Sequence, residues 1–190
     1  YDFNNQILCM TMWISGQMKK NLITIRHTQR GYPIGEIYKK NKKDCLKLRK
    51  IFQKKTKSPY INDAYGELYL KVINSFAFNL VAIHYDMNNY QLSVNKSAIS
   101  LIKEIMKEFD MIVMRLGLKI NQSINSRIIQ TLKSKNHTMS MLSDFKQNKK
   151  LELENQWKSL VKIREIKKEN IKVSKKIYLT VKSKIKNAYI

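Results

Sequence analysis

The stretch from residue 67 to residue 82 reads ELYLKVINSFAFNLVA. As a helix it has apolar side chains on every side, which is typical of a helix buried at the centre of a domain. Lys71, Ser75 and Asn79 are spaced four apart and therefore share one helix face. Burying an ammonium group and an amide costs several kcal/mol unless they are paired, so this face is a candidate functional site. In the alternative, Lys71 extends to solvent and Asn79 bonds to a neighbouring loop.

The chain after this stretch keeps a helical spacing of apolar residues. Between residues 97 and 116 they recur at intervals of three and four, and Gly117 is a suitable helix stop. Asp63 and Ser174 are predicted to cap the helices that follow them, and residues 86–90 form a polar loop. Helices are predicted at residues 63–84, 97–116, 123–132, 139–145, 151–169 and 174–186.

The N-terminal part of the chain has a different pattern. It is rich in β-branched and aromatic residues and is predicted to form an antiparallel meander of three short strands. The first turn of the meander is predicted at Ser15-Gly16. The strands are expected at residues 6–14, 20–27 and 32–37.

A helical period replaces the strand pattern at residues 42–53, and Thr-Lys-Ser-Pro at residues 56–59 interrupts it. We therefore predict a domain boundary at this point. One domain is expected at residues 1–58 and an all-helical domain at residues 59–190.

The composition is strongly basic, with a formal net charge of +23 and a hydrophobic content of 43% that is sufficient for a packed core. Lysines are spread along the whole chain and outnumber arginines, which favours a compositional bias over a dedicated nucleic-acid motif. The alternative is a functional basic surface for RNA or an anionic membrane. The basic run from Lys162 to Lys176 is the strongest candidate for it, and a solvated helix face is the more ordinary interpretation.

Neither a metal site nor a membrane segment is predicted. Cys9 and Cys45 form no metal-binding pair, and the histidines lack ligand spacing. No apolar run is long enough to span a bilayer. Two isolated thiols suit a reducing compartment, so we expect a cytoplasmic protein.

Four motifs occur in a fixed order along the chain. They are Pro33-Ile-Gly-Glu36, the helix with Lys71 and Asn79, Ser140-Met-Leu-Ser-Asp144, and Glu152 twelve residues after Ser140. Each motif is weak alone, but the ordered set resembles the ketopantoate reductase family. The resemblance covers residues 6–190.

The resemblance implies a fold and an activity. It implies an α+β fragment in which residues 1–58 are the end of a Rossmann-type dinucleotide-binding domain lying mostly upstream. An all-helical domain of the 6-phosphogluconate-dehydrogenase-like type would follow. The implied reaction is the NADPH-dependent reduction of 2-dehydropantoate, a small 2-oxo acid, to pantoate in pantothenate biosynthesis. The family also allows a homodimer.

The resemblance further assigns roles to single residues. Lys71 would donate a proton to the substrate keto oxygen, where hydride transfer builds negative charge. Glu152 would contact the cofactor near the nicotinamide and orient Lys71. Ser75 stands where the family often has Asn and has a shorter reach. The substrate would be held by hydroxyl and amide side chains, namely Ser75, Asn79, Asn89 and Ser140.

Some features depart from the family. No GxGxxG occurs, so these residues lack the loop that holds a pyrophosphate in Rossmann domains. Trp157-Lys158 replaces an Asn-Gly pair, and Val173-Ser174 replaces the usual Pro before the last helix. Two other functions therefore stay open. One is a reductase-derived basic protein that acts as an RNA-binding or ribonucleoprotein scaffold, and the other is a reductase of a different 2-oxo acid.

Overall fold

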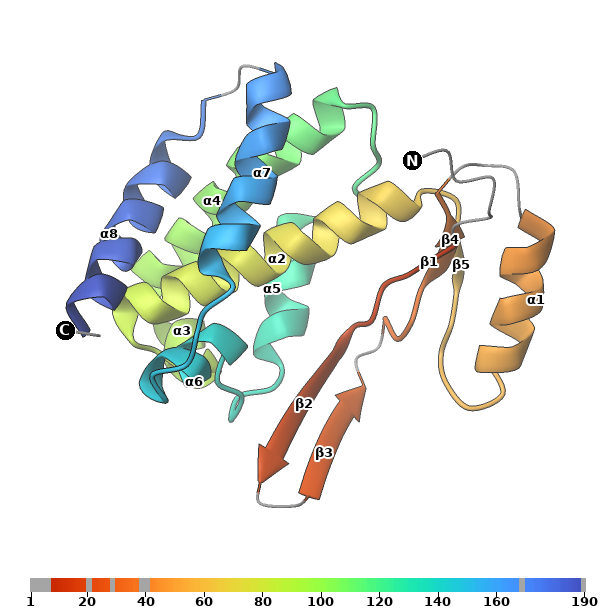
Figure 1. The fold of residues 1–190 in the computed structure, drawn as a ribbon, viewed down its shortest axis with the longest axis horizontal. Coiled ribbons are helices and arrows are strands. Elements are labelled where there is room, and N and C mark those ends of the chain that lie inside the picture. The colour runs from red at the N-terminus through yellow and green to blue at the C-terminus, as the bar shows by residue number, and fades with distance from the viewer. Residues whose placement is uncertain (1–7, 20–21, 28–29, 38–41, 168–169, 189–190) are drawn as a thin grey trace. The chain divides into compact units, whose positions relative to one another are not determined.

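The computed structural model describes residues 8–19, 22–27, 30–37, 42–167 and 170–188. The chain forms two compact units, Tyr1–Lys71 and Val72–Ile190. Helix α2 (Ala64–Tyr85) contributes its first turns to the first unit and the remainder to the second. The prediction of short strands and a helix followed by an all-helical segment is confirmed (Figure 1).

The first unit contains five strands and one helix among its described residues. Strand β4 (Ile34–Glu36) lies between β1 (Leu8–Met10) and β5 (Tyr60–Ile61) in a small sheet. Strands β2 (Ile14–Lys19) and β3 (Leu22–His27) form a separate antiparallel hairpin, and helix α1 covers Lys42–Phe52.

The predicted antiparallel meander is wrong in two respects. Strand β4 pairs in parallel with β5, which comes after helix α1 in the sequence. Ser15 and Gly16 form no turn, because they pair with Arg26 and Ile25 within the hairpin ladder. Local turn propensity at Ser-Gly was overridden by continuous pairing of the two strands.

Two glycines allow the segment around β4 to approach the chain around β5. Gly31 has φ +66°, and an added Cβ there would overlap the Lys57 carbonyl, which accepts a hydrogen bond from the Tyr32 amide at 2.8 Å. A Cβ on Gly35 would lie 2.8 Å from Ile61. Only glycine fits such close backbone contacts without displacing the neighbouring chain.

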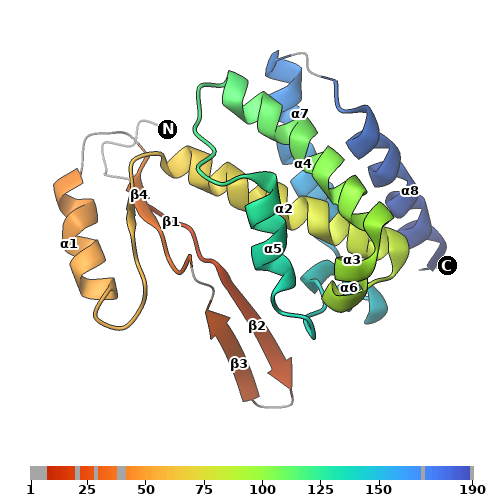
Figure 2. The ribbon, with the colours of Figure 1, turned by 180° about the vertical axis from the view of Figure 1, so that it is seen from behind.

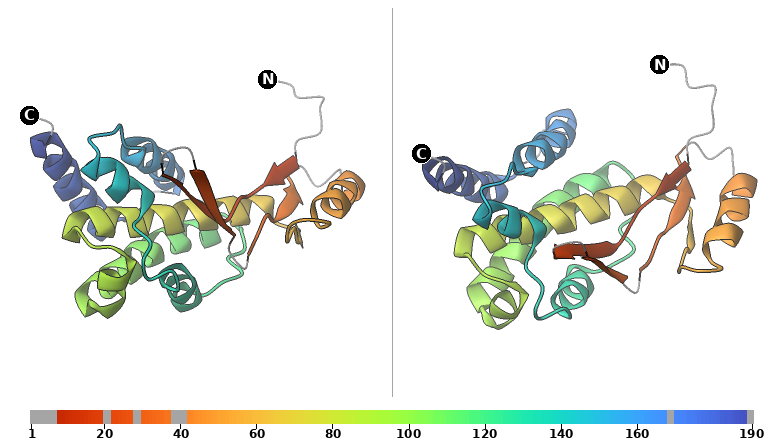
Figure 3. Two further views of the ribbon diagram at one scale, coloured as in Figure 1. Left: turned by 90° about the horizontal axis from the view of Figure 1, so that it is seen from below. Right: turned by 60° about the horizontal axis from the view of Figure 1, so that its bottom comes forward.

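The second unit is built around α2, as the sequence predicts (Figures 1, 2 and 3). Phe76, Phe78, Leu80 and Val81 are completely buried, although they point in different directions around the helix. The inner face of α4 packs in the same core. The remaining helices are α3 (Asn89–Val94), α4 (Lys96–Arg115), α5 (Ile124–Leu132), α6 (Ser140–Lys146), α7 (Leu153–Lys167) and α8 (Lys172–Ala188).

Several helix ends follow the predicted local signals. The Asp63 carboxylate accepts a hydrogen bond from the Gly66 amide at 2.8 Å, and Ser123 caps α5. Gly117 has φ +79° directly after α4, as expected of a glycine helix stop. The short helix α3 was missed, because Asn88 and Gln91 form a capping box within a segment that reads as a polar loop.

The predicted cap of the last helix is wrong. Ser174 lies inside α8 and is buried, and its hydroxyl donates a hydrogen bond to Glu108 at 2.5 Å. The Glu108 carboxylate, which comes from α4, also accepts bonds from the Val173 and Ser174 amides at 2.9 and 2.8 Å. A carboxylate from another helix thus satisfies the free amides at the start of α8.

Trp157 marks one of the departures from the family pattern, and it lies within α7. Its ring stacks on Tyr178 of α8 with centroids 4.3 Å apart and an interplanar angle of 9°. It also stacks on Phe76 of α2 at 6.0 Å. Trp157 therefore helps to pack α7 and α8 onto α2, which an Asn-Gly pair could not do.

Candidate functional site

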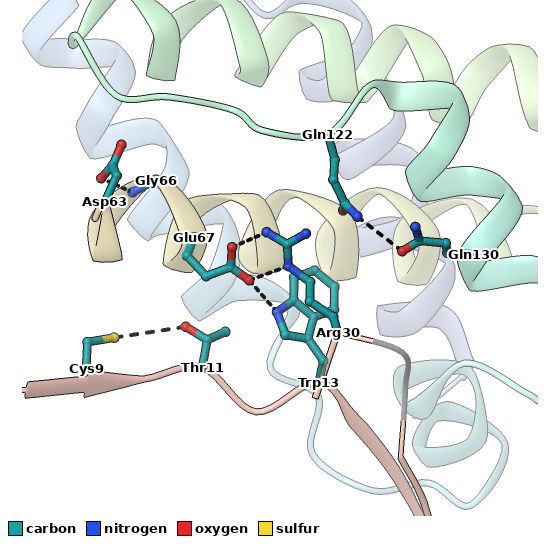
Figure 4. Close-up of polar contacts among 9 residues, drawn as sticks. All are labelled: Cys9, Thr11, Trp13, Arg30, Asp63, Gly66, Glu67, Gln122 and Gln130. Atoms are coloured by element: carbon teal, nitrogen blue, oxygen red, sulfur yellow. Dashed lines mark hydrogen bonds and ion pairs between the residues drawn. The ribbon is translucent and has the colours of Figure 1, made fainter. Parts of the chain in front are cut away.

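Glu67 is the centre of a polar cluster in the first unit (Figure 4). It lies on α2 and is 4% exposed. The Trp13 indole N–H donates to its Oε1 at 2.7 Å, and Arg30 Nε donates to the same oxygen at 2.5 Å. Arg30 Nη2 forms an ion pair with Oε2. Both carboxylate oxygens are therefore occupied, and the charge of Glu67 is balanced by Arg30.

Lys71 lies one helical turn after Glu67. Its Nζ is 5.1 Å from the centre of the Trp13 ring, and the Arg30 guanidinium is 5.4 Å from the same centre. Both distances are within the range of cation–π attraction. No hydrogen-bond acceptor in the described part of the chain contacts the Lys71 amino group. Burial lowers the pKa of Lys71 below its usual value, and the charge of Glu67 opposes that change.

One local signal in the sequence points to this cluster. Glu67 precedes Lys71 by four residues, so the two side chains share a helix face. Trp13 and Arg30 could not be found in this way. They lie 54 and 37 residues from Glu67 and meet it only through the fold of the first unit.

Ser75 and Asn79 are brought together in the second unit. Asn79 is 2% exposed, and its Nδ2 donates to the Ser75 carbonyl at 2.8 Å and to the Ser75 hydroxyl at 3.2 Å. Its Oδ1 accepts a hydrogen bond from the Met141 amide at 3.0 Å. Asn79 therefore ties α2 to the first turn of α6, the helix on which Ser140 is the first residue.

Asn89 makes a different set of contacts. It is completely buried, and its Nδ2 donates to the carbonyls of Thr131 and Ser134 at 3.0 and 3.2 Å. Its backbone amide donates to the His137 carbonyl at 3.0 Å. Its Oδ1 has no hydrogen-bond partner among the described residues. Asn89 thus holds the start of α3 against the connection between α5 and α6.

Ser140 and Glu152 are both exposed. Ser140 begins α6, and Glu152 directly precedes α7, where its carbonyl accepts the amide of Gln156 at 3.0 Å. Lys71 belongs to the first unit, whereas the other five predicted residues belong to the second. Of the predicted site residues in the described part of the second unit, Ser75 and Asn79 are hydrogen-bonded to each other, and Asn79 is bonded to the start of α6.

Gly31 and Gly35 do not form a pyrophosphate-binding loop. Such a loop needs glycines whose backbone is open to the ligand at the start of a helix. These two glycines instead face Lys57 and Ile61 of their own unit.

Two other kinds of site were sought in the same residues. Within the described ranges, no three or more His, Cys, Asp or Glu side chains group in a way that could hold a metal ion. None of the helices in those ranges combines the length and the apolar character needed to cross a membrane.

Comparisons with solved structures relate the fold to known enzymes. A 2-dehydropantoate 2-reductase from Geobacter metallireducens matches with a TM-score of 0.81 and 12% identity over 93% of this chain and 60% of the reductase. A dimeric ketopantoate reductase from Staphylococcus aureus matches with a TM-score of 0.68 and 15% identity over 95% of this chain and 62% of the reductase. D-mandelate dehydrogenase in complex with NADH matches with a TM-score of 0.73 and 12% identity over 95% of this chain and 68% of the dehydrogenase. The chain therefore spans about 60% of the length of the reductases, and at these identities the likeness concerns the fold.

The sequence itself carries the family assignment. No curated protein matches the chain. The family described as ketopantoate reductase PanE/ApbA C terminal matches residues 63–184, which is more than half of the chain and includes all six predicted site residues. The chain belongs to the ketopantoate reductase family.

Proposed function

We propose that the complete protein containing this chain reduces 2-dehydropantoate to pantoate with NADPH, in the cytoplasm. The observation that carries the proposal is the environment of the Lys71 amino group. A half-buried lysine with a lowered pKa and no hydrogen-bond acceptor within the described residues lies in the part of the chain that matches the family. Such perturbed groups are frequent at catalytic sites.

Lys71 is the proposed proton donor. When hydride reaches a 2-oxo acid, negative charge develops on the keto oxygen, and a positioned ammonium stabilises that charge before it gives up a proton. A lowered pKa brings the ammonium closer to the acidity at which proton transfer is efficient near neutral pH. Glu67 counteracts this effect and keeps the amine from losing its proton too easily.

The remaining side chains of the proposed site hold the substrate. Ser75 and Ser140 offer hydroxyl groups for the carboxylate or hydroxyl of the acid. Asn79 bonds to Ser75 and to the first turn of α6, so its amide fixes the spacing between the two serines. Asn89 is proposed to act at the same site, for which its internal bonds to Thr131 and Ser134 must exchange with the substrate.

The hydride would come from NADPH, which a dinucleotide-binding domain would hold. We propose residues 1–58 as the end of that cofactor domain and residues 59–190 as the substrate domain. Glu152 is exposed and is proposed to contact the cofactor near the nicotinamide and to orient Lys71. A homodimer completes the proposal, by analogy with the dimeric reductase from Staphylococcus aureus.

The test is oxidation of NADPH with 2-dehydropantoate, followed by absorbance of the reduced nicotinamide, with the product of the complete reading frame. Lys71→Ala is expected to lower the rate about 100- to 1000-fold, because one charge-stabilising donor is removed. Lys107→Ala, at an exposed lysine of α4, is the matched control and should leave the rate unchanged. A folded protein without turnover would refute the proposed reduction of 2-dehydropantoate.

A second candidate is a reductase of another 2-oxo acid. The similarity of the fold to D-mandelate dehydrogenase, which acts on a 2-hydroxy acid, favours including it. The same assay with benzoylformate and with short 2-oxo acids separates the two candidates. Higher kcat/KM for one of these acids than for 2-dehydropantoate would assign the substrate to it.

A further inference from the structure

Helix α8 has an outer face made almost entirely of lysine. The helix carries six lysines and no acidic residue. Residues spaced three, four and seven apart share a helix face, which places five of the lysines in one stripe. All five are exposed, and Leu179, which is 52% exposed, lies among them. The α8 lysine stripe consists of Lys172, Lys175, Lys176, Lys182 and Lys186.

The opposite face of α8 is already occupied within the second unit. Ile177, Tyr178 and Val181 are buried, and Tyr178 stacks on Trp157. The sixth lysine, Lys184, points inward and donates to the carbonyls of Ile83 and His84 at 2.8 and 3.4 Å, where α2 ends. Of the five stripe lysines, Lys182 also lies 5.9 Å from the centre of the Tyr178 ring.

The stripe has little compensating charge. Within the ranges the structure describes, only Lys182 has a carboxylate partner, Glu154 at 3.6 Å, and Glu154 also contacts Lys158 at 3.4 Å. The two lysines lower the pKa of Glu154 below its usual value. Lys172, Lys175 and Lys176 stand in the first turns of α8, where the helix dipole disfavours a lysine and where the Glu108 carboxylate of α4 accepts the Val173 and Ser174 amides. Compositional bias explains the number of lysines, and burial of the apolar face explains why they lie on the outer face; the distinctive feature is a row of five cations along the whole helix with one carboxylate partner among the described residues.

We infer that the α8 lysine stripe is a binding surface for the phosphate backbone of a nucleic acid. From Lys172 to Lys186 the helix rises about 21 Å, at about 1.5 Å per residue. One strand of a duplex presents about six phosphates over that length, at about 3.4 Å each. A linear row of cations with flexible stems suits this repeating charge, and it contacts the backbone without reading sequence.

Other anionic partners fit the stripe less well. A helix that binds a membrane surface buries an apolar face in the lipid, and the apolar face of α8 is packed inside the protein. Protein interfaces are depleted in lysine and depend on aromatic and arginine anchors, which the stripe lacks. Binding to a membrane surface is distinguished from binding to a nucleic acid by comparing vesicles with a duplex.

The test measures binding of this chain to a fluorescein-labelled 20-base-pair duplex by anisotropy over a series of salt concentrations. A variant with all five stripe lysines changed to Gln is compared with one in which five exposed lysines elsewhere are changed to Gln: Lys96, Lys107, Lys133, Lys135 and Lys150. Both variants lose the same net charge, and Lys and Gln have similar helix propensities, so α8 should stay folded. Circular dichroism and thermal melting check this point.

Five phosphate contacts predict that the stripe variant reduces the slope of log K against log salt by about 4.5 and binds at least about tenfold more weakly near physiological salt. The control variant should stay within about twofold. Equal losses in both variants would show that net charge alone is responsible and would overturn the inference. It would also be overturned if the stripe mediated binding to vesicles containing phosphatidylserine but not to the duplex.

Discussion

Two buried carboxylates, one in each unit, are paired with arginine but differ in how completely they are satisfied. Glu67 in the first unit receives three hydrogen bonds, two from Arg30 and one from Trp13. Asp110 in the second unit pairs with Arg127, yet Asp110 Oδ1 and Arg127 Nε and Nη1 lack partners among the described residues.

The difference is reflected in what surrounds each pair. Burial raises the pKa of Asp110 above its usual value, although the charge of Arg127 and its hydrogen bond act in the opposite direction. Glu67 has a second cation nearby, Lys71, and its charge partly opposes the lowering of the Lys71 pKa by burial. The pair in the first unit therefore acts on a neighbouring chemical group, whereas the pair in the second unit joins α4 to α5. A completely satisfied carboxylate can tune a neighbour because it is fixed in position.

Of the substitutions that test this comparison, Arg127→Met should lower the free energy of unfolding the most. It leaves the Asp110 carboxylate buried without a counter-charge, which is expected to lower the free energy of unfolding by about 3–5 kcal/mol. Urea denaturation followed by circular dichroism measures the loss. The double variant Asp110→Leu with Arg127→Met should recover most of it, because no charge is then left unpaired. A double variant as unstable as the single one would contradict this account of the pair.

Arg30→Met should be less damaging. Glu67 then keeps the hydrogen bond from Trp13 and the nearby charge of Lys71, and Arg30 is itself 17% exposed at its side chain. We expect a loss of about 2 kcal/mol, the usual range for hydrogen bonds to a charged group. The same denaturation experiment checks the value, with Lys107→Met on the exposed side of α4 as the matched control. A loss as large as that of Arg127→Met would mean that the two pairs are equivalent.

Glu67→Gln should have the smallest effect on stability and a specific effect on Lys71. The amide still accepts the indole N–H of Trp13, but the negative charge that raises the pKa of Lys71 is gone. Since burial already lowers this pKa, the substitution should lower it further, and the amine should lose its proton at a lower pH. The readout is the pH dependence of amine-reactive labelling at Lys71, measured by mass spectrometry in this chain.

Lys47, an exposed lysine on α1, provides the internal reference for the labelling, and its profile should not change. A Lys71 profile that stays in place, or moves to higher pH, would show that Glu67 does not influence the amine. Because the labelling does not depend on catalysis, it tests the electrostatic coupling even if the reductase assay fails.

Much of the helical unit could be predicted because its signals are local. The apolar residues around α2, the Asp63 cap and the Gly117 stop each depend on residues within a few positions of one another. Local signals failed where long-range pairing competed with them. Ser15-Gly16 became part of a strand, and Glu108 from α4 took over the cap that Ser174 was predicted to form.

Helical periodicity and motif spacing are properties of the chain alone, so the helical face that carries Lys71, Ser75 and Asn79 and the order of the motifs could be predicted without a structure. The contacts of these side chains depend on the tertiary structure. Trp13 and Arg30 reach Glu67 across tens of residues, Asn79 bonds to Met141 of α6, and packing sorts the α8 lysines into one inward and five outward. Contacts between distant segments depend on how the core packs, which no local pattern encodes.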